Sequence, residues 1–134
     1  MNILILDSIS EIITATLTEA QTTAMDITVS YGDATSTSMT EGVQLSASNG
    51  VTPVTICSAP AASTRRLIRN ITVYNKDGVA HGVILKLYSG GIYYGITKQN
   101  ILAGETWSFG KSVQGSLMET VDENAITSLI MAFS

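Results

Sequence analysis

The first 64 residues of this 134-residue sequence contain no lysine or arginine. All seven basic residues fall in residues 65–134, so the first part has a net charge of −6 and the second of +2. Two interpretations stay open: the two parts neutralise each other within one folded chain, or the acidic part contacts Arg65, Arg66 and Arg69 of a neighbour. In either case, an acidic chain with three clustered arginines is not typical of a protein that binds nucleic acid.

Cysteine and charged residues are also scarce. Cys57 is the only cysteine, which excludes a disulfide within the chain, and we expect it to be a small buried apolar residue. Charged residues make up 13% of the sequence and hydrophobic residues 45%, so uncharged polar side chains must form much of the surface. The 17 threonines and 15 serines fit this requirement, because threonine suits strands and serine suits turns.

Long hydrophobic runs are missing as well. The apolar start of the chain follows no basic residues and is interrupted at Asp7, which is not the pattern of a signal peptide. It is also too short to span a bilayer. We therefore expect neither export by a standard signal nor a membrane partner. The apolar side chains at this end are instead candidates for contact with a neighbouring protein: Ile3, Leu4, Ile5 and Leu6.

Residues 65–109 alternate between strand-forming runs and turns. The runs are rich in β-branched and aromatic residues and are bounded by glycine, asparagine or aspartate. They are residues 67–74, 83–88, 92–96 and 106–109. Short turns between such runs are typical of antiparallel sheets.

The region upstream contains further strand signals. Residues 26–31 alternate between apolar and polar side chains. Asn49 and Gly50 predict a hairpin turn between strands at residues 43–46 and 52–57. The small polar residues 32–41 predict an exposed, mobile loop.

Two segments are compatible with either strand or helix. Residues 10–17 and 126–133 both contain apolar residues at strand spacing and at helical spacing, with Asp122 as an N-cap for the second helix. The β-branched content of the first and the recurrence of turns before the second favour strands.

These segments give about eight to ten strands, too many for one sheet in a chain of this size. The sequence therefore predicts an all-β fold: an antiparallel β-sandwich, jelly-roll or immunoglobulin-like, with an extended terminal arm. Residues 1–24 would be the N-terminal arm or first strand, and residues 25–134 a single β-sandwich domain. The expected core residues are Ile27, Val29, Val54, Ile56, Ile71, Val73, Val83, Leu85, Leu87, Ile92, Ile96, Trp107 and Phe109.

The sequence offers little for catalysis. His81 is the only histidine and falls in the turn-rich residues 78–82, so we expect an exposed loop residue without a catalytic role. One histidine and one cysteine do not supply a zinc site within one chain, and no calcium-loop spacing is present. We therefore expect no catalytic residues, no metal, no cofactor and no enzymatic activity.

Two clusters are suited to recognition. Tyr88, Tyr93 and Tyr94 surround one predicted hairpin, with Trp107 nearby in sequence. They could pack against one another across strands, form a protein contact or stack on a carbohydrate. The second cluster joins the three arginines to Lys86; it would be either a solvated strand edge or a contact with a neighbour.

Several segments resemble small virion proteins of tailed bacteriophages. They are residues 27–33, 58–66, 71–77 and 102–106, together with the tyrosine-bearing hairpin, so the likeness spans roughly residues 20–110. The present chain continues for 25 residues beyond Phe109, where the simplest members of this group end.

This resemblance implies a non-enzymatic β-sandwich that decorates or cements the capsid, or lies at the head–tail junction. An alternative is a tail or fibre accessory module that binds a receptor or a carbohydrate. The implied partners are further copies of the chain, with a trimer favoured, and virion proteins such as the major capsid protein. The implied location is the virion, assembled in the host cytoplasm.

Overall fold

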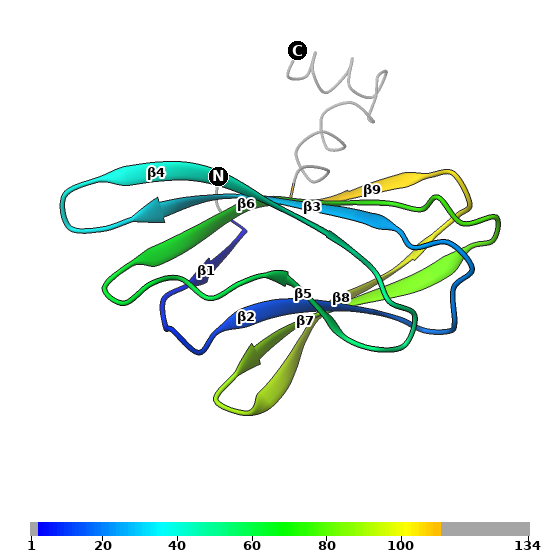
Figure 1. The fold of residues 1–134 in the computed structure, drawn as a ribbon, viewed down its shortest axis with the longest axis horizontal. Helices are drawn as coiled ribbons and strands as arrows, with labels where there is room; N and C mark the ends of the chain where they lie inside the picture. Colours follow the sequence, from blue (N-terminus) through cyan, green and yellow to red (C-terminus); the bar gives the residue numbers. More distant parts are fainter. Residues whose placement is uncertain (1–2, 111–134) are drawn as a thin grey trace, which may run out of the picture.

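The computed structural model describes residues 3–110, which form nine β-strands and no helix (Figure 1). The strands are β1 (Leu4–Leu6), β2 (Ile12–Leu17), β3 (Asp26–Ala34), β4 (Met39–Ala47), β5 (Val54–Cys57), β6 (Arg65–Tyr74), β7 (His81–Ser89), β8 (Ile92–Ile101) and β9 (Thr106–Phe109). The expected strands at residues 116–121 and 126–133 lie outside the described residues.

The strands form two antiparallel sheets that face each other (Figure 1). In the five-stranded sheet, β6 pairs with β3 along one side, and β3 pairs with β4 at the edge. On its other side, β6 pairs with both β1 and β9, which lie end to end along it. The four-stranded sheet has the order β5-β2-β7-β8. The prediction of an all-β chain folded into antiparallel sheets is confirmed.

The core lies between the two sheets and draws on both. Its buried members from the predicted set are Ile27, Val29, Ile56, Ile71, Val73, Val83 and Leu85. Leu87, Ile96, Trp107 and Phe109 pack partly buried against them. Ile92 was predicted to be buried and is 54% exposed, because it starts β8 at the tip of a hairpin that projects beyond the facing sheet (Figure 1).

Residues 1–24 contribute two strands to the sheets. β1 pairs with β6, and β2 lies between β5 and β7 in the other sheet. Ile13, Ala15 and Leu17 of β2 are buried, so this segment supplies a central strand of the core.

Two local predictions about the region around β4 were wrong. Asn49 and Thr52 do form a tight bridge, with Gly50 at φ +58°, yet the flanking strands do not pair with each other. β4 pairs with β3, and β5 pairs with β2 in the other sheet, so the turn carries the chain between sheets. Residues 32–41 are also not a loop, because β3 and β4 extend as a hairpin and leave only residues 35–38 between them.

A β-bulge sets which residues of β6 face the core. The register with β3 shifts between Ser30 and Tyr31, so that Arg69 has no partner in the ladder. Ile68 and Ile71 are therefore both buried although they are three residues apart. A prediction from strict alternation along β6 would therefore assign the residues on one side of the bulge to the wrong face.

Candidate functional site

The outer surface of β4 exposes three large apolar side chains. Met39, Val43 and Leu45 are 48%, 57% and 74% exposed and lie on one face of the strand. We call these three residues the β4 stripe. β4 is an edge strand, because in the described part of the chain it pairs only with β3. An edge strand of nine residues that exposes three large apolar side chains is a surface that proteins usually cover or protect with charge.

Val43 and Leu45 of the β4 stripe face outward, and the polar residues Gln44 and Ser46 that alternate with them face inward. Gln44 and Ser46 stand opposite Val29 and Ile27, two buried core residues of β3. The Gln44 side-chain oxygen accepts hydrogen bonds from the backbone N–H and the hydroxyl of Ser58, at 2.9 and 3.1 Å. The usual order of apolar residues inside and polar residues outside is thus reversed on this strand.

The β4 stripe was not among the sites predicted from the sequence. The signal was the alternation from Val43 to Ser46, which predicts a strand with one apolar face. That pattern does not say which face turns to the core. The pairing with β3 decides it.

One expectation placed Arg66 on a solvated strand edge, and that expectation is wrong. β6 has neighbours on both sides, and the Arg66 side chain is 11% exposed. Its guanidinium forms two hydrogen bonds to the Asp33 carboxylate, at 2.8 and 2.9 Å, and two to Ser58. It also lies 4.1 Å above the ring of Tyr31. These contacts stabilise the charged form and raise the pKa of Arg66 above its usual value, chiefly through Asp33.

Arg65 and Arg69 remain more accessible than Arg66. Arg65 is exposed at the start of β6. Arg69 occupies the bulge and lies 3.3 Å from a carboxylate oxygen of Glu41, which is itself largely exposed. The three arginines therefore do not form one surface patch.

The charge asymmetry of the sequence is resolved within the chain. Each described ion pair that uses lysine or arginine joins an acid of residues 1–64 to a base of residues 65–134. Besides the two arginine pairs, Lys76 lies 3.1 Å from Asp26. These contacts favour internal neutralisation over the alternative in which the acidic part reaches a neighbouring subunit.

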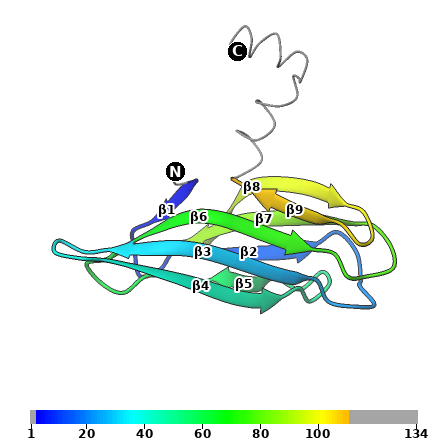
Figure 2. The same cartoon turned by 90° about the horizontal axis from the view of Figure 1, so that it is seen from above.

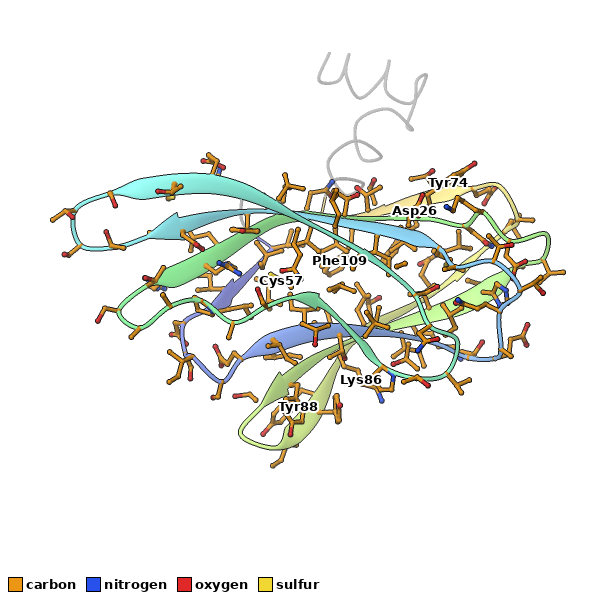
Figure 3. All side chains as sticks on the ribbon, viewed as in Figure 1. Asp26, Cys57, Tyr74, Lys86, Tyr88 and Phe109 are labelled. Atoms are coloured by element: carbon orange, nitrogen blue, oxygen red, sulfur yellow. The ribbon has the colours of Figure 1, made fainter. Side chains whose placement is uncertain are left out.

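The predicted tyrosine cluster lies on the projecting β7–β8 hairpin, where Figure 3 labels Tyr88 and Lys86. The rings of Tyr88 and Tyr93 are 4.6 Å apart, and the Lys86 ammonium lies 5.6 Å from the Tyr93 ring centre. Tyr93 and Tyr94 are about half exposed, at 48% and 51%. Trp107 does not join them, because it belongs to β9 in the other sheet and packs against Phe109.

The apolar residues at the chain start are shared between the core and the surface. Leu6 is fully buried and stands opposite Arg66, so it is a core residue of its own chain and not an exposed contact. Ile3 and Leu4 pack partly buried against the core. Ile5 is 38% exposed and remains the one of the four that is open to a partner.

His81 is not an exposed loop residue. It opens β7, is 2% exposed, and its Nε2 lies 2.7 Å from Oδ2 of Asp77. Its Nδ1 has no hydrogen-bond partner and lies 3.6 Å from the Glu19 carboxylate. Asp77 also accepts hydrogen bonds from the backbone N–H groups of Thr22 and Gly78.

These hydrogen bonds fix the charged form of Asp77. The backbone N–H of Thr22 and the His81 ring lower the pKa of Asp77 to about 2. The fully buried Asn75 extends the network, since its side-chain amide donates to three backbone carbonyls, including those of Ile101 and Leu102. The network ties the β6–β7 connection to the end of β8 and to the chain before β3.

Cys57 is fully buried, as predicted, and its side chain lies in the interior between the sheets (Figure 3). Burial raises the pKa of its thiol, which keeps the sulfur protonated. Among residues 3–110, no three His, Cys, Asp or Glu side chains group together in a way that could hold a metal ion. The described part of the chain also contains no helix that is long and apolar enough to cross a membrane.

Comparisons of this chain with protein-family models, with curated proteins and with solved structures gave no match.

Proposed function

We propose that this chain is a non-enzymatic structural protein of a tailed-bacteriophage particle, which assembles through the β4 stripe into a homo-oligomer. The observation that carries the proposal is the reversed pattern on β4. Val43 and Leu45 point to solvent while Gln44 and Ser46 point to the core. A departure of this kind from local patterning marks a surface selected for contact.

The charge distribution supports assembly through this surface. Within the β4 face only Glu41 is charged, and Arg69 lies against it in the same chain. A neighbouring subunit that covers Val43 and Leu45 therefore buries no unpaired charge at that point. Full burial of a side chain of this size contributes about 1.5–3 kcal/mol before the cost of association.

The phage assignment rests on the resemblance of residues 20–110 to small virion proteins, and on the two-sheet fold that such proteins would share. We propose the jelly-roll or immunoglobulin-like type of sandwich for it. A role in decorating or cementing the capsid, or at the head–tail junction, agrees with a surface made of serine, threonine and few charges. The further partner in this proposal is the major capsid protein, and the proposed location is the virion.

The experiment that tests the phage role is binding to phage heads that lack the protein. Wild-type protein is mixed with purified heads, and the pellet after centrifugation is assayed for the chain. The proposal expects co-sedimentation at a saturable copy number. If the protein does not co-sediment with heads but binds purified tails, the capsid role is wrong and the protein acts in the tail.

The second candidate is a tail or fibre module that binds a carbohydrate or receptor. It is favoured by the half-exposed rings of Tyr93 and Tyr94 beside Lys86 on a projecting hairpin. Replacing both tyrosines by serine would abolish binding to host envelopes under this candidate. Under capsid decoration, the same double variant would bind heads as the wild type does.

A further inference from the structure

The chain passes from the five-stranded sheet to the four-stranded sheet through a tight turn at Asn49 and Gly50. This turn follows β4 and precedes β5, and it lies beside the connection between β2 and β3 at one end of the sandwich (Figure 2). Asn49 is exposed, whereas Gly50 is buried. Asn49 is also the only asparagine of the full sequence that is followed by glycine.

An asparagine followed by glycine can modify itself. The backbone nitrogen of the glycine, once it has lost its proton, attacks the side-chain carbonyl carbon of the asparagine. A carbon–nitrogen bond closes a five-membered imide, the bond to the side-chain nitrogen breaks, and ammonia leaves. Water then opens the imide at either carbonyl and leaves aspartate or isoaspartate. Glycine favours ring closure because it has no side chain to hinder it.

In the folded chain, Gln21 holds the nitrogen that would attack. The N–H of Gly50 donates a hydrogen bond to Oε1 of Gln21, and the two heavy atoms lie 2.9 Å apart. This N–H must leave its acceptor and lose its proton before the nitrogen can attack the side chain of Asn49. Because Gly50 is buried, leaving Gln21 would strand a donor without a partner, which costs free energy.

The Gln21 side chain is itself fixed by Ser48. Its Oε1 accepts a hydrogen bond from the Ser48 hydroxyl at 2.6 Å, and its Nε2 donates to the Ser48 carbonyl oxygen at 3.1 Å. The Ser48 hydroxyl in turn accepts from the backbone N–H of Met25 at 2.9 Å, and Ser48 is 5% exposed. Gln21 therefore ties the β2–β3 connection to the turn through three hydrogen bonds.

Backbone hydrogen bonds hold the rest of the turn. The carbonyl oxygen of Gly50 accepts from the N–H of Leu17 at 2.9 Å, and that of Asn49 accepts from the N–H of Thr52 at 3.1 Å. Gly50 has φ +58°, a conformation that favours glycine. Ring closure rotates the backbone between Asn49 and Gly50, so the turn has to open before Asn49 reacts.

We propose that Asn49 is a modification site, at which the chain converts itself to aspartate and isoaspartate, and that Gln21 keeps this reaction slow while the turn is closed. Water is the only co-reactant. Loop opening is fast compared with this chemistry, so the rate follows the fraction of chains in which the turn is open. Isoaspartate would add a negative charge and lengthen the backbone where the chain crosses between the sheets. This inference goes beyond the proposed function and does not depend on it.

The test incubates the full-length protein at mildly alkaline pH and measures aspartate and isoaspartate at residue 49 by peptide mapping. We expect the wild type to convert slowly when folded and rapidly in guanidinium chloride. Gln21→Met removes both polar atoms at similar size. The lost hydrogen bond corresponds to about a tenfold change in the opening equilibrium, so this variant should convert about ten times faster. Equal rates in the folded and unfolded wild type would overturn the proposal, as would a folded Gln21→Met variant with the wild-type rate.

Two further variants and a second asparagine separate the role of Gln21 from a general loss of stability. Gln21→Glu keeps an oxygen that can accept from Gly50 and should convert more slowly than Gln21→Met. Gln99→Met changes an exposed glutamine of β8 and should convert as the wild type does. Conversion at Asn100, which is exposed on the same strand, should not rise in Gln21→Met; a rise at both asparagines would contradict the proposal.

Hydrogen exchange at the Gly50 amide decides if Gln21→Met does not fold. In the folded wild type, the proposal expects this amide to be protected, because its N–H is buried and bonded to Gln21. Exchange at the rate of an unstructured peptide would show that the turn is open in the wild type and would overturn the proposal.

Discussion

His81 Nε2 lies 2.7 Å from Oδ2 of Asp77, and both side chains are buried where the β6–β7 connection meets the end of β8. A histidine–aspartate pair often serves catalysis, in which the histidine activates a nucleophile. Here the His81 side chain is 1% exposed. Asp77 also accepts hydrogen bonds from the backbone N–H groups of Thr22 and Gly78, so the pair links the β6–β7 connection to the chain before β3.

The first prediction concerns acid stability. The folded state lowers the pKa of Asp77 to about 2, below the value of about 3.9 for an unfolded aspartate. The unfolded chain therefore binds the proton more readily, and stability must fall as the pH drops from about 4 toward 2. Asp77→Asn should flatten this part of the profile of unfolding free energy against pH, measured by urea unfolding. A variant with the wild-type slope would show that other carboxylates control acid unfolding.

The second prediction separates stability from function at His81. His81→Ala removes the buried partner of Asp77, and we expect a loss of about 1–3 kcal/mol in the free energy of unfolding. Binding to heads, measured below the unfolding temperature, should not change. Loss of a function by a variant that remains folded would overturn the non-enzymatic interpretation.

The third prediction concerns the Arg66–Asp33 pair. Removal of one partner leaves the other charge partly buried, so Arg66→Met should destabilise the chain by about 3 kcal/mol. Arg66→Lys keeps the charge but loses the paired contact with Asp33 and should recover only part of that loss. Arg65→Met removes an exposed arginine of the same strand and should change the unfolding free energy by less than about 0.5 kcal/mol. Equal losses in Arg66→Met and Arg65→Met would contradict the assigned role.

The fourth prediction tests the packing beneath β4. A β-carbon on Gly42 would lie 2.8 Å from the Tyr31 ring, which supports the Arg66 guanidinium. Gly42→Ala should therefore destabilise the protein by about 1–3 kcal/mol, as overpacking does. Gly95→Ala is the control, because nothing lies within 4 Å of its added carbon. Its unfolding midpoint should equal or slightly exceed that of the wild type.

Much of the strand content could be predicted from the sequence, because alternation and turn residues are local signals. β6, β7 and β9 begin and end within a few residues of the predicted runs. The partners of the strands could not be predicted in the same way. Asn49 and Gly50 do form a turn, but β4 pairs with β3 and β5 pairs with β2, so the turn joins the two sheets and does not close a hairpin.

The candidate site depended on information that the local sequence does not hold. Val43 and Leu45 have the same pattern as inward residues, and only the register with β3 turns them outward. His81 follows a glycine-containing turn, a typical exposed context, and is buried because its ring meets Asp77 from the same connection. The Arg66 side chain is largely buried, and β6 is not an edge strand because it has neighbours on both sides.

The central claim is that the β4 stripe holds copies of this chain together, and the mass in solution tests it most directly. Light scattering over a range of concentrations should give an oligomer for the wild type, with the trimer as the expected size, and a monomer for Leu45→Asp. Ile9→Asp is the matched control: Ile9 is 69% exposed, close to the 74% of Leu45, but lies in the turn between β1 and β2. It should keep the wild-type mass. A wild-type chain that stays monomeric at high concentration, or a Leu45→Asp variant with unchanged mass, would contradict the account.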